Sequence, residues 1–334
     1  MSGAALVTPA GAQASGVRSY AYGARSEAPK IQFRKGQARP GFTGGPITAT
    51  DGETVSVYVQ DELLAADPTA NQHWADVLAG LLHGPEIAEV SLYLATPQRV
   101  GQYCGSRALG CYSDDVIVAL GVDTRGVSAQ SVVTHKYGHH VANSRLNDPW
   151  DAIDWGTKRW SSYESVCSRS MTGELVPGDE GRFYQVNPGE LFAEDYRVLN
   201  ERREGIPESP WEVVDQRLYP DQQALDLLAE DVTSPWTGST TTTYKAVLGA
   251  QASGRGFRVS TPLDGNFSVK LVAPPRAKLT LRVVDLASGK VLAADATPLR
   301  VKTVDASVCG QRTLQVQVKR VSGAGAFTLA VSTP

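Results

Sequence analysis

Apolar and polar residues follow two patterns along the chain, and the pattern changes near residue 234. Before it, strand-like alternation and helix-like spacing take turns. Strands are predicted at Thr54–Gln60, Ile87–Ala95 and Asp115–Val122, and helices at Asn71–His83 and after Ser128, which is suited to an N-cap. The order strand, helix, strand, strand, helix predicts an α+β fold.

Two more helices are predicted further along. Glu190–Asn200 has helical spacing and follows Pro188 and Gly189, which suit a helix start, and Asp221–Glu230 is the second. Tryptophans at 150, 155 and 160 do not share one helical face, so we interpret them as core or groove-wall residues and not as a binding platform.

Beyond residue 234 the chain consists of short β-rich runs separated by turn signals. They are Thr242–Leu248, Gly256–Ser260, Phe267–Val272, Leu279–Val284, Val291–Ala293, Leu299–Thr303, Leu314–Val318 and Phe327–Val331. Many short strands at this spacing predict a β-sandwich. We therefore predict an N-terminal arm at 1–46, an α+β domain at 47–235 and an all-β sandwich domain at 236–334.

Composition narrows the functional classes. The 334 residues carry a net charge of −3, which argues against a general nucleic-acid or membrane-surface partner. Hydrophobic residues make up 42% of the chain, enough for real cores, but no apolar run approaches the roughly 20 residues of a membrane-spanning helix.

Four cysteines favour an exported protein. Cys104 and Cys111 bracket a short glycine-bearing loop that a disulfide would close, which leaves Cys167 and Cys309 as a second pair. Residues Ala4–Ala14 either resemble the end of an export signal or are simply rich in alanine and glycine. We expect a secreted, extracellular protein.

The arm around residues 17–46 is basic and has little apolar periodicity. Arg18 to Arg39 contains six basic residues against one acid, Glu27. One interpretation is a flexible, solvated segment. The other is a prosegment that contacts the catalytic domain within the same chain, with Tyr20, Tyr22, Phe33 and Phe42 as anchors.

A pair of histidines gives the first sign of chemistry. His135 and His139 are four residues apart in a predicted helix, so both imidazoles lie on one face and can reach one metal ion. Zinc peptidases use this spacing in the motif His-Glu-x-x-His, whose glutamate is the general base. Here Lys136 occupies the glutamate position.

The third ligand can be sought in the sequence. A third histidine in the x-x-Gly-x-x-His pattern is excluded, because positions 142 and 145 are Ala142 and Arg145. Asp148, Asp151 and Asp154 lie nearby without a ligand motif. Glu190 and Glu194 share one face of a later helix, so one carboxylate could bind the ion while the other holds a ligand histidine through its second nitrogen.

These two segments resemble the gluzincin group of zinc metallopeptidases. The stretch Tyr184…Asn187…Glu190-Leu-Phe-Ala-Glu194 is similar to the Glu helix of the anthrax lethal factor type of catalytic domain. The resemblance covers about residues 54–230. It implies a zincin-like fold, a Zn²⁺ cofactor, His135, His139 and Glu190 as ligands, Glu194 as the partner of a ligand histidine, and Tyr184 as an oxyanion donor.

Lys136 departs from the family pattern. A protonated lysine cannot accept a proton, and like charges about 4 Å apart cost on the order of 4 kcal/mol at an effective dielectric of 20. The sequence therefore predicts a secreted zinc endopeptidase, acting on a protein or peptide substrate, whose turnover is greatly reduced. The alternative is a non-catalytic pseudopeptidase that acts as a binding or adhesion protein.

Overall fold

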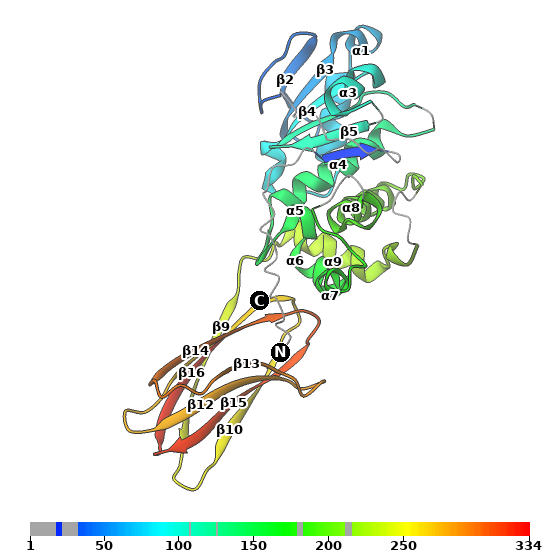
Figure 1. Cartoon of the computed structure of the whole chain (residues 1–334). Coiled ribbons are helices and arrows are strands. Elements are labelled where there is room, and N and C mark those ends of the chain that lie inside the picture. Colours follow the sequence, from blue (N-terminus) through cyan, green and yellow to red (C-terminus); the bar gives the residue numbers. More distant parts are fainter. Residues whose placement is uncertain (1–17, 22–32, 107, 125, 179–182, 211–215) are drawn as a thin grey trace. The chain divides into compact units, whose positions relative to one another are not determined.

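The computed structural model describes residues 18–21, 33–106, 108–124, 126–178, 183–210 and 216–334. The predicted export-signal remnant lies outside these ranges. The fold is mixed α/β and divides into two compact units (Figure 1). Unit 1 comprises Met1–Ser144 and Val176–Tyr219, and unit 2 comprises Arg145–Leu175 and Pro220–Pro334.

Unit 1 is built on a six-stranded sheet in the order β1-β5-β6-β4-β3-β2. Its strands are β1 (Arg18–Ala21), β2 (Phe42–Thr48), β3 (Thr54–Gln60), β4 (Ser91–Ala95), β5 (Ala108–Ser113) and β6 (Val116–Leu120). The central strands β3, β4 and β6 are parallel, whereas β2, β5 and β1 pair antiparallel with their neighbours. β4 and β6 are buried at every position, as expected of nearly continuous apolar runs in a covered sheet.

The helices of unit 1 lie between β3 and β5 and after β6. They are α1 (Asp61–Ala66), α2 (Ala70–Gly80), η1 (Pro85–Glu89), α3 (Pro97–Cys104), α4 (Ala129–Asn143), η2 (Tyr184–Val186), α8 (Pro188–Glu204) and η3 (Gln216–Leu218). The strand predicted at Ile87–Ala95 is wrong in its first part, because Gly84 and Pro85 begin a short 3₁₀ helix and the strand starts only at Ser91.

Part of the predicted N-terminal arm belongs to this sheet. Residues 42–46 begin the edge strand β2, where two glycines and a proline hide the strand pattern in the sequence. Phe33 and Phe42, two of the predicted anchors, are buried, and the ring of Phe33 lies 4.5 Å from that of Tyr93. The other two predicted anchors have no described side chains.

Unit 2 combines short helices with two four-stranded sheets. Its first part holds β7 (Leu146–Asn147), β8 (Trp150–Asp151), α5 (Ala152–Trp155), α6 (Lys158–Tyr163), α7 (Val166–Met171) and α9 (Gln222–Thr233). The domain prediction grouped these helices with the metal-motif helix, whereas their contacts place them in one unit with the C-terminal sheets. The boundary at residue 235 stays a prediction.

The C-terminal sheets are sandwich-like and antiparallel, in the orders β10-β15-β12-β13 and β14-β11-β16-β9. The strands are β9 (Thr240–Leu248), β10 (Gly254–Ser260), β11 (Gly265–Val272), β12 (Lys278–Asp285), β13 (Val291–Asp295), β14 (Val301–Val308), β15 (Thr313–Ser322) and β16 (Gly325–Thr333). Every predicted β-rich run overlaps one of them.

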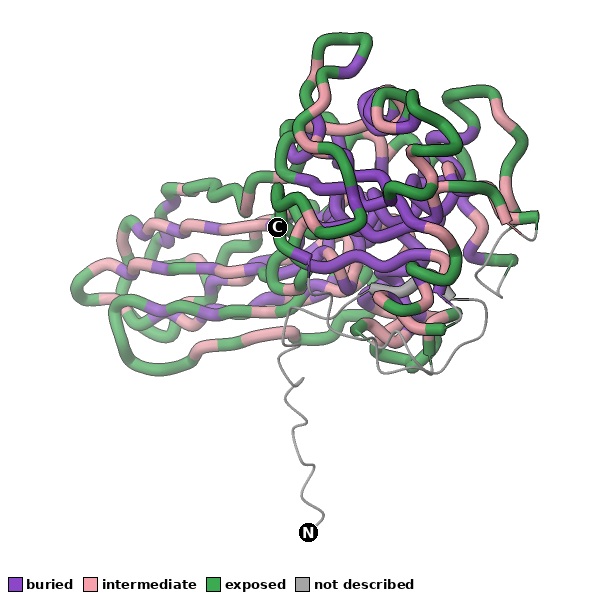
Figure 2. The backbone as a smooth tube through the Cα atoms, turned by 90° about the horizontal axis from the view of Figure 1, so that it is seen from above, coloured by how far each residue is buried: buried purple, intermediate pink, exposed green. Residues whose placement is uncertain are grey.

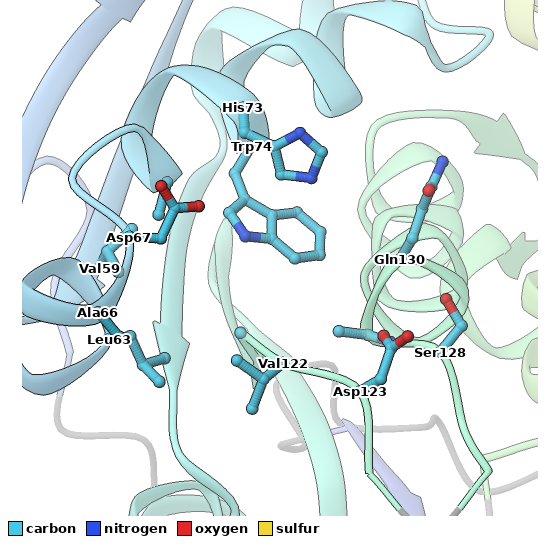
Figure 3. A pocket seen from close by; sticks show the side chains of 13 residues that line it. Val59, Leu63, Ala66, Asp67, His73, Trp74, Val122, Asp123, Ser128 and Gln130 are labelled. Atoms are coloured by element: carbon cyan, nitrogen blue, oxygen red, sulfur yellow. The ribbon is translucent and has the colours of Figure 1, made fainter.

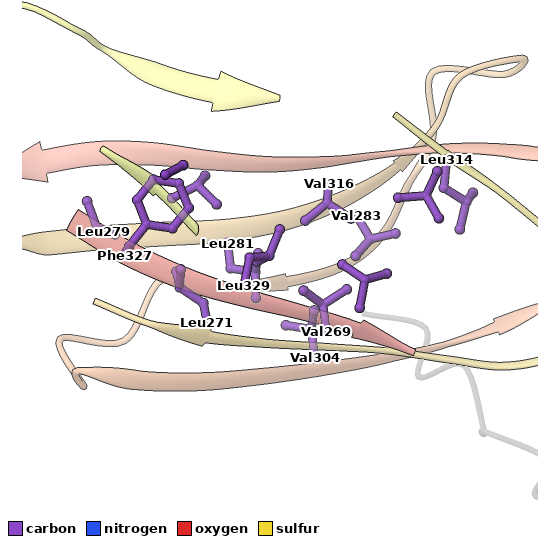
Figure 4. Close-up of a cluster of buried hydrophobic side chains, with 14 of the residues drawn as sticks. Val269, Leu271, Leu279, Leu281, Val283, Val304, Leu314, Val316, Phe327 and Leu329 are labelled. Atoms are coloured by element: carbon purple, nitrogen blue, oxygen red, sulfur yellow. The ribbon is translucent and has the colours of Figure 1, made fainter. Parts of the chain in front are cut away.

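Alternation along these strands builds the core between the two sheets. In β11, for example, buried and more exposed positions alternate strictly, and such strands appear as tubes of alternating colour in Figure 2. Phe267, Leu281, Val316 and Leu329 are fully buried members of this core, part of which Figure 4 shows.

Both predicted disulfides are confirmed. One joins Cys104 at the end of α3 to Cys111 in β5, and the other joins Cys167 in α7 to Cys309 after β14. Disulfides are typical of extracellular proteins. Within the described ranges, no helix has the length and apolar character needed to cross a bilayer.

Candidate metal centre

Helix α4 presents the two motif histidines on one face. Its start is capped as predicted, because the Ser128 hydroxyl accepts a hydrogen bond from the Ser131 N–H at 3.4 Å. The rings of His135 and His139, one turn apart, have their centroids 5.0 Å from each other. The helix therefore sets the spacing of two nitrogen ligands before any other element is involved.

Helix α8 supplies the carboxylates. The Asn187 side chain caps it by accepting hydrogen bonds from the N–H groups of Gly189 at 2.8 Å and Glu190 at 3.4 Å, and Pro188 occupies its first turn. Glu190 and Glu194 follow one turn apart on the same face. The cap thus begins the helix at the point that places Glu190 in its first turn.

A glycine in the motif lets the two helices approach closely. A Cβ added at Gly138 would lie 3.0 Å from the Ala193 Cα and 3.2 Å from the Tyr196 Cβ. Helices α4 and α8 are in extensive contact here. Gly138 is therefore required for packing and not for an unusual backbone conformation.

We expect Gly138→Ala to lower the free energy of unfolding by about 1–3 kcal/mol, because the added methyl group must push α8 away. Gly80→Ala, in the last position of α2, is the matched control, since an added Cβ there meets nothing within 4 Å. Urea titration of both variants measures the difference. Equal stability of the two variants would contradict the packing role of Gly138.

The structure brings His135, His139 and Glu190 together. Glu190 Oε2 lies 3.1 Å from His135 Nε2 and 3.2 Å from His139 Nε2, and all three side chains are 0% exposed. One ligand atom from each residue fits within 4.8 Å of the others. This buried cluster could hold a metal ion.

Glu194 fixes the orientation of His135. Its Oε1 lies 2.7 Å from His135 Nδ1, and since a carboxylate only accepts, the Nδ1–H donates. In the neutral ring, the other nitrogen then carries a lone pair that faces the Glu190 carboxylate. Two acceptors that face each other in a buried site repel unless a cation lies between them, so this arrangement suits a metal.

Arg197 was not among the residues predicted for the site. Its guanidinium donates to Glu194 Oε2 at 2.6 Å and to Glu201 Oε2 at 2.5 Å. The other oxygen of Glu201 accepts from the Ser131 hydroxyl at 2.7 Å, which ties the network back to α4. The i, i+3 and i, i+4 spacings from Glu194 to Arg197 and from Arg197 to Glu201 were the available sequence signal.

The surroundings of His139 and Glu190 keep both side chains in the protonation states that bind metal ions. Burial lowers the pKa of His139 to about 3, an effect that Lys136 reinforces and Glu190 opposes. Burial disfavours the charged form of Glu190, but His139 and Lys136 outweigh it and hold the pKa of Glu190 well below its usual range. At neutral pH His139 is thus a neutral imidazole and Glu190 a carboxylate, which are the forms that bind metals.

Two further predicted residues, Lys136 and Tyr184, lie on the same two segments. Lys136 is fully buried in α4 next to His135, and its charge acts on both His139 and Glu190. Tyr184 lies in η2, just before α8, with its hydroxyl oxygen buried. Its role as an oxyanion donor stays a prediction.

His140 lies outside the cluster. Its Nε2–H donates to the Glu86 carbonyl at 2.8 Å, and its Nδ1 lies 3.3 Å from the Tyr112 hydroxyl. The Tyr112 ring of β5 also stacks against His139, with centroids 6.4 Å apart. These contacts tie β5 to the histidine helix.

A separate cavity of about 410 Å³ lies beside α2 and the first turn of α4 (Figure 3). Trp74, Asp67, Asp123 and Gln130 are among its lining residues, and Figure 3 shows the Trp74 indole between the α1–α2 side and α4. None of the residues predicted for the site lines this cavity.

No protein-family model matches the chain, and no curated relative matches it. Among solved structures, it is similar to a pre-peptidase C-terminal domain of collagenase from Bacillus anthracis, with 14% identity, a TM-score of 0.23 and coverage of 27% of this chain and 88% of that one. A mitogen derived from Yersinia pseudotuberculosis has 9% identity, a TM-score of 0.24, and coverage of 29% and 87%. The SPBc2 prophage-derived protein YomS has 16% identity, a TM-score of 0.22, and coverage of 29% and 97%. Scores this low carry no argument about fold or activity.

Proposed function

We propose that unit 1 is the zincin-like catalytic part of a secreted, zinc-dependent endopeptidase of gluzincin type, in which Lys136 keeps turnover low. The observation that carries the proposal is the buried cluster of His135, His139 and Glu190. In this cluster Glu194 accepts a hydrogen bond from Nδ1 of His135, the ring nitrogen that does not face Glu190. The two disulfides support the secreted location.

The residues present fit a zinc ion. Two imidazoles and one carboxylate are a known catalytic zinc donor set. Within the described part of the chain, His139 Nε2 and Glu190 Oε1 are buried and make no well-aligned hydrogen bond, and a bound ion would give His139 Nε2 a partner. His135, His139 and Glu190 would hold the ion.

When bound, zinc supplies Lewis acidity toward a carbonyl and lowers the pKa of water. The chain's own residues prepare the site for it. Glu194 keeps the proton of His135 on Nδ1, and Arg197 keeps Glu194 ionised. Burial favours the neutral acid of Glu194, but the charge of Arg197 and the hydrogen bond from His135 outweigh burial and lower the pKa of Glu194 to about 2. While it is protonated, Lys136 cannot accept a proton, so it would not replace the glutamate that removes one in the family pattern.

The buried Lys136 is also the observation that favours the second candidate. A lysine beside the ligands weakens metal binding by like charge, and it lacks the acceptor that hydrolysis needs. A pseudopeptidase that acts as a binding or adhesion protein would retain the fold and the ligand residues. It would not need the general-base glutamate, because it binds its partner without cleaving it. The two candidates differ in what happens when the base is restored.

Zinc titration tests the metal centre directly. After treatment with a chelator and its removal, isothermal titration calorimetry of the full chain should show one zinc site per chain. His139→Ala should weaken this binding by at least about tenfold, because one of three protein ligands is lost. His73→Ala, an exposed histidine on α2, is the control and should leave binding unchanged. Zinc binding that His139→Ala does not affect would exclude this cluster as the site.

A further inference from the structure

The C-terminal sandwich carries a strong positive charge that the charge of the whole chain conceals. Residues 240–334 contain 13 lysines and arginines, four aspartates and no glutamate, so their net charge is +9, whereas the whole chain has −3. The rest of the chain is therefore acidic. So marked a charge difference between two parts of one chain indicates that the basic part binds a polyanion.

The four aspartates lie away from the outer face of the sheet β10-β15-β12-β13. Asp264 and Asp285 are buried. Asp295 pairs with an inward position of β12 and forms an ion pair with the buried Lys302 at 3.6 Å. Asp305 belongs to β14 in the other sheet. This face therefore has no acidic side chain of its own to neutralise cations.

The outer face of this sheet carries four cations instead. β10, β15 and β12 are neighbours in the sheet (Figure 1), and their outward positions include Arg258, Lys278, Arg282 and Lys319. All four side chains are exposed, and within the described part of the chain none of them forms an ion pair with a carboxylate. We call these four residues the basic face. Like charges that share a face repel each other, and a bound anion relieves that repulsion.

Two glycines open a hollow in the basic face. β10 pairs with β15 in an unbroken register that sets Gly254 opposite Lys319 and Gly256 opposite Gln317. A hollow of about 370 Å³ lies at this place, and its lining includes Arg255, Gln315, Gln317 and Lys319. Glycine inside a strand weakens the strand, and where there is no bulge it marks a position at which a ligand comes close to the backbone.

Side-chain amides supply hydrogen-bond donors in the hollow. Gln317 Nε2 donates to Gln315 Oε1 at 2.6 Å, which orients both amides. Gln315 Nε2 lies over Gly256, since a Cβ added at this glycine would be 2.9 Å from that nitrogen. The hollow therefore combines amide N–H donors with cations, and both bind the oxygens of an acid group.

The side chains of this face distinguish between classes of polyanion. Single-stranded nucleic acids bind by stacking their bases on aromatic rings. In the described sheet, no aromatic side chain points outward from β10, β15 or β12, because the one aromatic residue there, Phe257, packs inward against Phe327. An acidic polysaccharide presents hydroxyls and acid groups along an extended chain, and amides, hydroxyls and cations on an open sheet can bind both.

We propose that the basic face, with the hollow at Gly254 and Gly256, binds an acidic polysaccharide through its sulfate or carboxylate groups. The two disulfides fit this partner, since they are typical of extracellular proteins. The proposal goes beyond the proposed function, because it concerns unit 2 and needs no metal.

The test offers defined polyanions to the full chain in the presence of a chelator. The probes are a fluorescent heparin decasaccharide, which is sulfated, and a fluorescent oligogalacturonate of equal length, which is carboxylated. Binding is measured by anisotropy at about 0.1 M salt, where distant charges are largely screened. A neutral dextran oligosaccharide should not bind. The acidic probe that binds more tightly identifies the acid group that the face recognises.

A pair of charge-matched variants locates the site. Arg282→Gln combined with Lys319→Gln should weaken binding at least about tenfold, because two charge-assisted contacts are lost. Lys245→Gln combined with Lys270→Gln removes the same charge from exposed positions of β9 and β11 in the other sheet, and should change binding less than about twofold. All four side chains are exposed, and an unchanged midpoint of thermal unfolding confirms that each variant is folded.

A variant without a charge change tests the hollow. Gly256→Val fills it and pushes the Gln315 amide aside, so binding should weaken at least about threefold through lost complementarity. Gly249→Val is the matched control, because a Cβ added there meets nothing within 4 Å, and it should bind like the unchanged chain.

Four results would overturn the proposal. They are equal losses in the two charge variants, unchanged binding by Gly256→Val, no binding of either acidic oligosaccharide, and tighter binding of duplex DNA or of phosphatidylserine vesicles than of both oligosaccharides. Because zinc is absent throughout, these outcomes are independent of the zinc titration. A chain that binds an acidic oligosaccharide but no zinc would refute the peptidase and keep the polysaccharide site.

Discussion

Lys136→Glu is expected to raise the rate at which the chain hydrolyses an unfolded protein, such as reduced casein, by about 10²–10⁴-fold in the presence of zinc. The substitution places a proton acceptor directly after the first ligand histidine, at a position that is fully buried. It also removes the positive charge that acts on His139 and Glu190, so zinc should bind more tightly. Release of peptides, abolished by a chelator, is the measurement.

Lys136→Gln separates these two effects. Glutamine removes the charge without supplying a base, so zinc affinity should rise as in Lys136→Glu while hydrolysis stays at background. If the Lys136→Glu chain folds and binds zinc but cleaves nothing, the endopeptidase proposal fails and the pseudopeptidase candidate stands. Hydrolysis that persists in the presence of the chelator would identify a contaminating enzyme.

Arg197→Met is expected to lower the free energy of unfolding of unit 1 by about 3–5 kcal/mol at pH 7. Arg197 lies between two carboxylates, Glu194 and Glu201, that are almost completely buried. Removing the guanidinium leaves both charges without their cation, and methionine fills the space but donates nothing. Native-state hydrogen exchange of the α8 amides measures the loss. Arg203→Met, an exposed arginine of the same helix, is the control and should change stability by less than about 0.5 kcal/mol.

The pH dependence of this loss follows from Glu194. Its pKa is about 2 in the folded chain and 4.5 ordinarily, so its ionised form adds stability that is complete above pH 4.5 and lost as the pH falls toward 2. Arg197→Met takes away the main cause of that lowered pKa. The stability difference between the two chains should therefore shrink as the pH falls from 7 to 3. A constant difference would show that Arg197 acts through packing alone.

Local patterns predicted the elements that carry the candidate site. The spacing of His135 and His139, the Ser128 cap and the Pro188 start of α8 are properties of short segments, and helical geometry converts them into shared faces without outside help. Strict alternation predicted the C-terminal strands for the same reason. Tyr184 shows the limit of this reasoning, since a residue in a turn before a helix has no periodicity that tells where its hydroxyl lies.

Elements whose conformation depends on contacts with other segments were missed or misassigned from the sequence. β5 contains a glycine and a cysteine and has no apolar alternation, and it exists as a strand because β6 and β1 pair with it. Residues 87–89 were predicted as the start of a strand, yet they belong to a 3₁₀ helix that begins at Pro85. The spacing of Arg197 from its two glutamates could be seen in the sequence. The large contribution of these ion pairs to stability arises from their burial, which the sequence did not show.

By itself, the sequence determined the helical faces, the sandwich-like strands, the Cys104–Cys111 pair and the lysine in the place of the base, because each depends on residues close in the chain or on residue type alone. The distant pair of Cys167 and Cys309 followed only because two cysteines remained. Only the tertiary structure decided that Glu190 meets both histidines, that Arg197 holds Glu194, and that Arg18–Ala21 pairs with the edge of β5. These contacts join segments up to about ninety residues apart. Their free energy comes from burial and pairing, which no local pattern encodes.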